Sequence, residues 1–133
     1  MTVYRRLKIG VFSTGDELAE PGTALPVGGV YDANRQILMA LITGLGADVS
    51  DLGILPDDAD AVRVGLAAAA KTHDLLLTSG GVSVGDEDHV RGAVEALGHL
   101  NFWRLAIKPG RPLALGQVGG AAFVGLPGNP VAA

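Results

Sequence analysis

The chain has 133 residues, a formal net charge of −4 and no cysteine, and its length suits a single domain. The absence of cysteine excludes disulfides, thiolate metal sites and thiol nucleophiles, and the negative charge argues against general nucleic-acid binding. No apolar run approaches the roughly 20 residues that a membrane-spanning helix needs.

The first quarter of the chain predicts a strand, a loop and a helix. Residues 8–13 form an apolar run of strand length that ends at the turn Thr14-Gly15-Asp16-Glu17. A loop rich in proline and glycine follows, and then either Asp32 or Asn34 can cap a helix that Gly46 ends. The residues expected on the apolar face of this helix are Ile37, Leu38, Leu41, Ile42 and Leu45.

Two further strand and helix units follow. Residues 47–55 predict a strand, and Asp57 and Asp58 open a helix in which Asp57 is the candidate N-cap and Asp58 lies in the first turn. Residues 74–79 predict the next strand, followed by a glycine-rich turn and a helix that stops near Gly98. The inward-facing residues of the two helices are Val62, Leu66, Ala69 and Ala70, and then Val90, Ala93, Val94 and Leu97.

The last third changes pattern. Residues 100–107, 113–118 and 121–124 are three strand-like runs with no room for crossover helices between them, so at least one strand must pair antiparallel. Val118-Gly119-Gly120-Ala121 is typical of a tight hairpin. The preceding units require a parallel sheet covered on both faces. We therefore expect a three-layer α/β/α domain with a mostly parallel, mixed sheet.

The glycine-rich turn after residue 79 is the most informative segment. Gly80, Gly81 and Gly85 allow the backbone to approach a ligand closely, and the start of the following helix can hold an anion. The acidic residues at 86–88 favour instead a metal or a proton-transfer role. Together they indicate a phosphorylated substrate handled with a divalent cation. The simpler alternative is a tight turn with helix-capping acids.

Other predicted strand-to-loop junctions are also restrained by proline and carry charged side chains. Prolines fix the backbone at Lys108-Pro109-Gly110-Arg111-Pro112 and at Leu126-Pro127-Gly128-Asn129-Pro130. Arg104, Lys108 and Arg111 are close in sequence and could bind an anionic ligand. No histidine stands near enough to the turn hydroxyls in these motifs to activate a nucleophile.

These motifs, in this order and spacing, resemble the molybdopterin molybdenumtransferases, that is, bacterial MoeA and the E domain of gephyrin. The related adenylyltransferase MogA shares the Ser-Gly-Gly turn and the later acids, whereas Thr-Gly-Asp-Glu-Leu, Lys-Pro-Gly-Arg-Pro and Leu-Pro-Gly-Asn-Pro are more similar to the molybdenumtransferases. The resemblance implies a MogA-like fold. It also implies insertion of molybdate into adenylylated molybdopterin, with release of AMP and help from Mg²⁺.

The resemblance also implies the site residues. Glu17, Asp57 and Asp88 are the expected metal ligands, and they are expected to be catalytic together with Lys108. Arg104 stands where the family commonly has lysine, which keeps the charge but changes its geometry. The expected substrate-binding residues are Thr14, Gly15, Ser79, Gly80, Gly81, Ser83, Gly85, Arg104, Arg111, Pro127, Gly128, Asn129 and Pro130.

Organisation and partners are expected by the same resemblance. Residues 1–7 are interpreted as a linker and 8–133 as the molybdopterin-binding domain of a longer cytoplasmic enzyme. That enzyme is expected to be a homodimer with a possible MogA-type adenylyltransferase partner. Because the family's site draws on further domains, the segment alone is expected to turn over poorly. The alternatives are a MogA-like adenylyltransferase and a non-catalytic molybdopterin-binding scaffold.

Overall fold

The computed structural model of the chain describes residues 5–15, 18–25, 27–56, 58–79, 89–104 and 112–126. Its strands are β1 (Lys8–Thr14), β2 (Leu18–Ala19), β3 (Val30–Tyr31), β4 (Asp48–Leu55), β5 (Leu75–Ser79), β6 (Gly98–Arg104), β7 (Pro112–Val118) and β8 (Ala121–Leu126). Its helices are α1 (Ala33–Gly44), α2 (Ala59–Ala70) and α3 (His89–Leu97).

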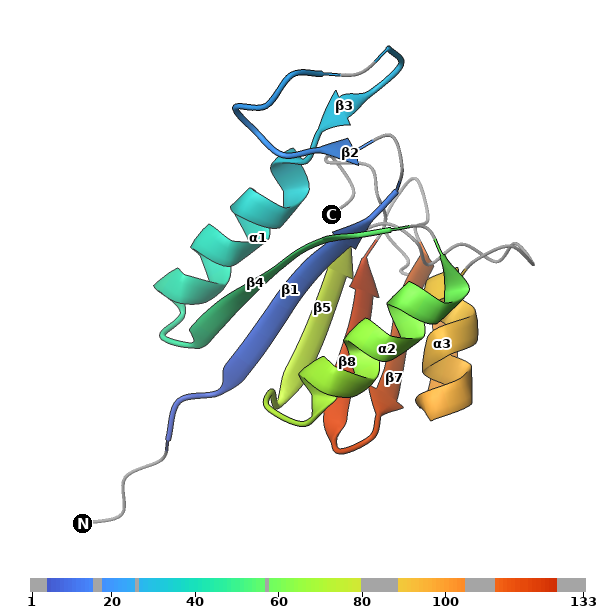
Figure 1. Ribbon diagram of the computed structural model, residues 1–133. Helices are drawn as coiled ribbons and strands as arrows, with labels where there is room; N and C mark the ends of the chain where they lie inside the picture. The colour runs from blue at the N-terminus through green and yellow to red at the C-terminus, as the bar shows by residue number, and fades with distance from the viewer. Residues whose placement is uncertain are drawn as a thin grey trace.

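The main sheet has the strand order β4-β1-β5-β8-β7-β6 (Figure 1). β4, β1, β5 and β8 run parallel to one another, whereas β7 is antiparallel to both of its neighbours. This confirms the predicted mostly parallel, mixed sheet. It also confirms the hairpin after Val118, where Gly119 adopts a φ of 56° between β7 and β8.

Helices cover the sheet on both faces, which confirms the three-layer α/β/α prediction (Figure 1). On one face α1 packs Leu38 over Ile9, Val11 and Leu77. On the other face α2 and α3 pack against each other and over a second apolar cluster. The fully buried members of that second cluster include Phe12, Val62, Leu66, Leu76, Val90, Val94, Val118 and Phe123.

The apolar face predicted for α1 is partly wrong. Leu38 is buried, and Ile42 is partly buried against the same apolar cluster. In contrast, Ile37, Leu41 and Leu45 are 53%, 61% and 86% exposed. These three recur every four residues, so they form a second stripe that faces away from the sheet. A single helix lying on a sheet contacts it through a narrow stripe. In α1 that stripe also contains the buried charged side chain of Arg35.

The structure decides which residue caps each of the helices α1 and α2. Asp32 caps α1, because its side chain accepts a hydrogen bond from the Arg35 backbone N–H. Asp58 caps α2 and accepts from Ala61 N–H at 2.9 Å. The assignment of Asp58 to the first turn is therefore wrong by one position, a usual uncertainty when two adjacent acids can both cap.

Two short strands were not predicted at all. β2 and β3 pair in parallel, Leu18 with Val30 and Ala19 with Tyr31, within the segment predicted to be only a loop. Strands of two residues have no periodic pattern to recognise. Figure 1 shows this pair beyond the end of the main sheet where β1 and β4 end.

Gly98 also has a different place from the prediction. The residue expected to stop α3 is already the first residue of β6, so this strand begins two residues earlier than predicted. A Cβ atom at Gly98 would lie 1.8 Å from the carbonyl oxygen of Gln117 on β7. Only glycine permits this close approach of the two backbones. The chain therefore passes from the end of α3 directly into β6, which pairs antiparallel with β7.

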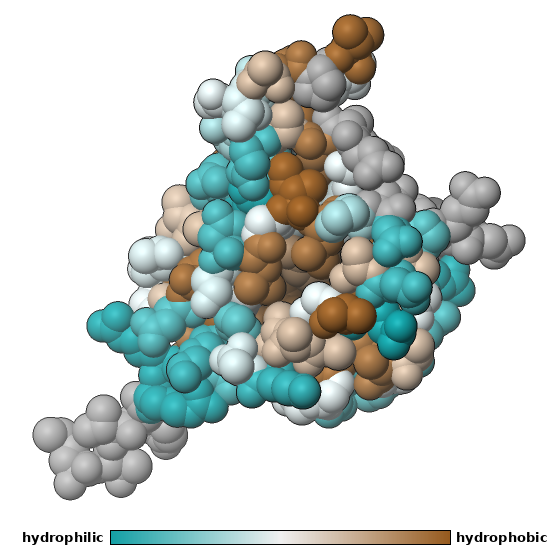
Figure 2. Space-filling model, in the orientation of Figure 1, coloured by the Kyte–Doolittle hydropathy of each residue, from teal (hydrophilic) through white to brown (hydrophobic). Residues whose placement is uncertain are grey.

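Figure 2 shows apolar surface between α1 and α2, where β4 forms the edge of the sheet. The register of β4 against β1 shifts after Asp51, so that Leu52 is an extra residue and Gly53 has a φ of 77°. Asp51 accepts a hydrogen bond from the Gly53 N–H at 2.9 Å. A bulge with a charged residue beside it protects an edge strand from pairing with another chain.

An ion pair connects β1 with β5 at the end of the sheet where these two strands begin. Arg5 donates two hydrogen bonds to Asp74, at 2.8 and 2.6 Å, and the Lys8 backbone N–H donates a third at 2.9 Å. The side-chain hydrogen bond from Arg5, followed by the one from Lys8, lowers the pKa of Asp74 to about 2. These contacts hold the start of β1 against the start of β5.

We expect the pKa of Asp74 to make stability depend on acid pH. The folded pKa of about 2 lies below the ordinary value of 3.8, so the contribution is present above about pH 4 and is lost as pH falls toward 2. Asp74→Asn should lower the melting temperature at pH 7 and have almost no effect at about pH 1.5, below the folded pKa. Asp60→Asn, which alters an 84% exposed side chain, is the control. An equal effect of Asp74→Asn at both pH values would contradict this assignment.

Candidate functional site at the carboxyl edge of the sheet

The parallel strands end together at one edge of the sheet. Thr14, the last residue of β1, pairs with Leu55, the last residue of β4. One residue earlier, Ser13 pairs with Ser79, the last residue of β5, and Ser79 pairs with Leu126, the last residue of β8. The segments that leave these four strands therefore all start from one edge, as the sequence predicts.

The chain changes direction across the sheet between β1 and β5. After β1 the chain returns through α1 to β4 on one side, whereas after β5 it continues through α3 to β6 on the other side. The two helices lie on opposite faces of the sheet. This is a topological switch point, the place where open α/β sheets bind their ligands.

Three of the predicted site residues lie at this switch point. Thr14 and Gly15 are at the end of β1, and Ser79 ends β5. Gly15 has a φ of 143°, and its carbonyl oxygen accepts a hydrogen bond from the Leu18 N–H at 3.2 Å. The start of β2 is thereby held next to the end of β1, in a backbone conformation that other residues rarely adopt.

Arg104 is at the same edge but farther along it. It is the last residue of β6 and pairs with Pro112 of β7. β6 lies three strands from β5, a separation of about 14 Å at the usual strand spacing. The remaining predicted site residues lie outside the described part of the chain: Glu17, Asp57, Gly80, Gly81, Ser83, Gly85, Asp88, Lys108, Arg111, Pro127, Gly128, Asn129 and Pro130.

Asn34 reaches this edge, although the sequence indicated it only as a possible helix cap. Because Asp32 caps α1, the Asn34 amide instead donates a hydrogen bond from Nδ2 to Ser79 Oγ, at 2.9 Å. Ser79 and its strand neighbour Ser13 are both buried and face α1 with their hydroxyl groups. Within the described residues the Ser13 hydroxyl has no hydrogen-bond partner. A polar, hydrogen-bonding layer therefore lies beneath the start of α1.

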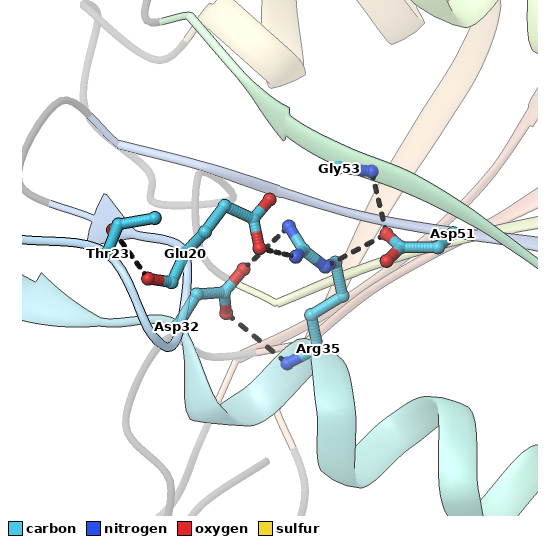
Figure 3. Close-up of polar contacts among 6 residues, drawn as sticks. All are labelled: Glu20, Thr23, Asp32, Arg35, Asp51 and Gly53. Atoms are coloured by element: carbon cyan, nitrogen blue, oxygen red, sulfur yellow. Dashed lines mark hydrogen bonds and ion pairs between the residues drawn. The ribbon is translucent and has the colours of Figure 1, made fainter.

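Arg35, the next residue of α1, is the centre of a charged cluster (Figure 3). Its guanidinium, 1% exposed, contacts Glu20 through Nη2, Asp32 through Nη1 at 3.1 Å and Asp51 through Nε at 3.0 Å. The contact with Glu20 is a hydrogen bond, whereas the Nη1 and Nε contacts are ion pairs that lack hydrogen-bond geometry. The cluster joins the end of β2, the cap of α1 and the bulge of β4.

The cluster does not resemble a metal centre. Among the described residues no group of three or more histidine, aspartate or glutamate side chains has the arrangement to hold a metal ion. Arg35 occupies the position between the carboxylates that a cation would take.

Across the same described ranges, no helix is both long and apolar enough to cross a membrane.

Comparison with known proteins identifies the family. Residues 10–133 match the family model described as "Probable molybdopterin binding domain". The chain belongs to this family. It is 50% identical, over 98% of its length, to a protein of Haemophilus influenzae named molybdopterin molybdenumtransferase, and it covers 32% of that protein. It therefore spans about one third of the length of the curated relative.

Solved structures support the same assignment. The molybdopterin biosynthesis MoeA protein of Pyrococcus horikoshii matches 98% of the chain with a TM-score of 0.83 and 33% identity, and the chain covers 32% of that protein. The tungsten cofactor synthesizing protein MoaB of Pyrococcus furiosus matches 98% of the chain with a TM-score of 0.70 and 19% identity, with 87% of that protein covered. The second likeness shows a shared fold only.

We expect the contact between Asn34 and Ser79 to contribute to the stability of this family member. A double-mutant cycle with Asn34→Ala and Ser79→Ala isolates the pair, because other interactions of the two side chains cancel. The coupling free energy of unfolding should be about 0.5–1.5 kcal/mol, the usual net value of one such hydrogen bond. Urea unfolding measures it. Strictly additive effects would contradict the contact.

Proposed function

We propose that this chain is the molybdopterin-binding domain, residues 8–133, of a molybdopterin molybdenumtransferase. In this proposal molybdate is inserted into adenylylated molybdopterin and AMP is released. The observation that carries the proposal is the match of residues 10–133 to the molybdopterin-binding family. The 50% identity to the Haemophilus influenzae molybdenumtransferase supports the reaction type. A cytoplasmic location, a homodimeric longer enzyme and a MogA-type partner are part of the same proposal.

The strand ends support a ligand site at the switch point. Thr14 and Ser79 lie on adjacent strands, with Ser13 and Ser79 in register. The glycine turn begins directly after Ser79 and is suited to cradle a phosphate through its backbone N–H groups. In this proposal the pterin phosphate and the AMP phosphate bind there, next to the polar layer formed by Ser13, Ser79 and Asn34.

Carboxylates near paired strand ends suit Mg²⁺. Glu17 follows Thr14 by three residues and Asp57 follows Leu55 by two, and Thr14 and Leu55 are partners in the sheet. At about 3.8 Å per residue both acids can reach one ion between the strands, and oxygen ligands are those that Mg²⁺ prefers. Glu17, Asp57 and Asp88 would hold it. When bound, it would neutralise charge on the phosphate oxygens as AMP leaves.

The protein supplies no covalent nucleophile in this proposal. Its contribution is to orient the dithiolene sulfurs toward molybdate and to balance the charge of the anionic substrates. Lys108, Arg104 and Arg111 provide the positive charge, with Arg104 suited to bidentate contact with an oxyanion. Each molybdate oxygen that sulfur replaces leaves as water or hydroxide, and a water molecule cleaves the bond that releases AMP.

The product that is released distinguishes this function from its alternatives. Adenylylated molybdopterin, molybdate and Mg²⁺ are incubated with the chain in excess over substrate, because turnover by this segment alone is expected to be slow. We expect AMP release without ATP consumption. Asp57→Asn should slow it by at least about tenfold. Asp58→Asn is the matched control, since asparagine caps a helix as well as aspartate does.

Other outcomes would replace the proposal. Consumption of ATP with molybdopterin as substrate would identify an adenylyltransferase. Binding of molybdopterin with neither reaction would indicate a scaffold module. Equal loss of AMP release in the Asp57→Asn and Asp58→Asn variants would contradict the assignment of Asp57 as a metal ligand.

A second prediction concerns Lys108. Its ammonium group is expected to attract molybdate or tungstate, so Lys108→Ala should weaken oxyanion binding at low ionic strength. The difference from the wild-type chain should shrink as salt rises, because salt screens charge interactions near the surface. Equilibrium dialysis with tungstate at several salt concentrations measures this. Lys71→Ala, a cation that directly follows α2, is the control. Unchanged tungstate binding by Lys108→Ala at low salt would overturn the assignment.

A further inference from the structure

We propose that the outward face of α1 is a self-association surface, on which a second copy of the chain packs its own α1 in antiparallel orientation about a two-fold axis. The proposal rests on the proposed function in one respect, because it names the surface for the homodimer included there. The face consists of Ile37, Ala40, Leu41, Gly44 and Leu45. We call these five residues the α1 surface.

The α1 surface is apolar although it faces solvent. Ile37, Leu41 and Leu45 are more than half exposed, and Ala40 and Gly44 are exposed beside them. The opposite side of α1 packs on strands β1, β4 and β5 (Figure 1), so these side chains do not contribute to the core of this chain. Single exposed apolar residues are ordinary, whereas a row of them on one helix face marks a contact surface.

The charge pattern of the helices sets α1 apart. Within α1, all of whose residues are described, the single charged side chain is that of Arg35, which is buried. By contrast, α2 exposes Asp60 and Arg63, and α3 carries Arg91 and Glu95 at its surface. A helix that faces water normally carries charged residues on that side. The outward face of α1 is therefore suited to contact with another uncharged surface.

The absence of charge favours a second copy as the partner. A two-fold axis places a residue that lies near it beside the same residue of the second copy, so a charged residue there would repel itself. The α1 surface has none. The last turn of α1 also lacks a basic residue, and an antiparallel copy brings the N-terminal end of its helix dipole to this C-terminal end. A lipid surface fits less well, because helices that lie on membranes carry Lys and Arg beside their apolar face.

Small residues allow the two helices to approach closely. A Cβ atom at Gly44 would meet nothing within 4 Å, so the space over this residue is open. If the antiparallel helices cross at Ala40, Ile37 of one copy lies opposite Gly44 of the other and enters that space. Helix axes pack about 8–10 Å apart, and Cα atoms lie about 2.3 Å from the axis. The two Ala40 Cα atoms would then be about 3.5–5.5 Å apart.

The size of the α1 surface predicts weak association by this chain. Twelve helical residues extend over only about 18 Å, whereas a standard interface buries about 800 Å² on each partner. Val30 and Tyr31 of β3, 52% and 47% exposed, add apolar surface next to the start of α1. We therefore expect a dimer that forms at high protein concentration and dissociates on dilution.

Disulfide crosslinking tests the two-fold contact directly, because the chain has no cysteine of its own. Ala40→Cys introduces a single thiol, and the expected separation overlaps the Cα distance of about 4.4–6.8 Å that a disulfide needs. Mild oxidation should convert most of this variant to a covalent dimer. Val64→Cys, at a position on α2 that is 59% exposed, is the matched control and should stay mostly monomeric. Equal crosslinking of the two variants would overturn the proposal.

Sedimentation equilibrium measures the association without a crosslink. Leu41→Glu should raise the dimer dissociation constant at least about tenfold, because the contact would bury unpaired carboxylates. Val64→Glu should leave the constant unchanged. Both positions are exposed, so both variants should keep melting temperatures near the wild-type value. A dimer that Leu41→Glu does not weaken would show that the copies meet elsewhere and would overturn the assignment of the α1 surface.

The outcomes distinguish this inference from the proposed function. A chain that releases AMP but stays monomeric up to about 1 mM would overturn the self-association and retain the reaction. A dimer through α1 without AMP release would retain the surface and contradict the reaction. Binding of the monomer to anionic lipid vesicles, abolished by Leu41→Glu, would assign the α1 surface to a membrane and overturn the proposal.

Discussion

Parallel pairing of β1 with both β4 and β5 is the constraint on which the rest of the molecule depends. Parallel neighbours require crossovers, and the crossovers are α1 and α2, which cover opposite faces of the sheet. Because the hydrogen-bonded register aligns Thr14 with Leu55 and Ser13 with Ser79, the segments that follow all start from the same edge. The position of the candidate site is thus a consequence of strand pairing.

The two ends of the sheet are built differently. At the amino end an exposed ion pair, Arg5 with Asp74, closes the sheet where no ligand is expected. At the carboxyl end the hydroxyls of Ser13 and Ser79 and the Arg35–Asp32 pair are buried, and the Asn34 amide is partly buried. Burial of polar groups costs free energy unless they are paired. Their concentration beneath the proposed ligand site is the pattern expected where function requires precise placement.

The comparisons and the structure address different questions. Family membership rests on the match of residues 10–133, and the fold is shared with proteins at identities as low as 19%. The fold alone therefore does not select a reaction. The motifs that resemble the molybdenumtransferases more than the adenylyltransferases follow β1 and β8 and precede β7 in the sequence. In the described part of the chain, Asn34 contacts β5 and Arg35 contacts β4, so α1 is joined to the strands near the same edge.

The sequence by itself determined the class of fold, the order of the helices and of the main-sheet strands, and the edge of the sheet at which the parallel strands end together. These follow from local patterns: apolar runs of strand length, helical periodicity, and glycine or proline at each junction. It also located the buried faces of α2 and α3, since both helices pack through one stripe. Two adjacent acids left the cap of α2 ambiguous by one residue, because Asp57 and Asp58 are equally suited to it.

Only the tertiary structure decided which contacts join segments far apart in the chain. The apolar stripe of α1 offered two faces, and packing chose the one with Leu38 and Arg35, leaving Ile37 and Leu41 exposed. The pairing of β2 with β3 involves two residues on each side, too few for any local pattern. Asn34 and Arg35 have ordinary helix-start neighbours in the sequence, and their partners lie up to 45 residues away. Such contacts depend on how the strands are placed beside α1, which no local pattern specifies.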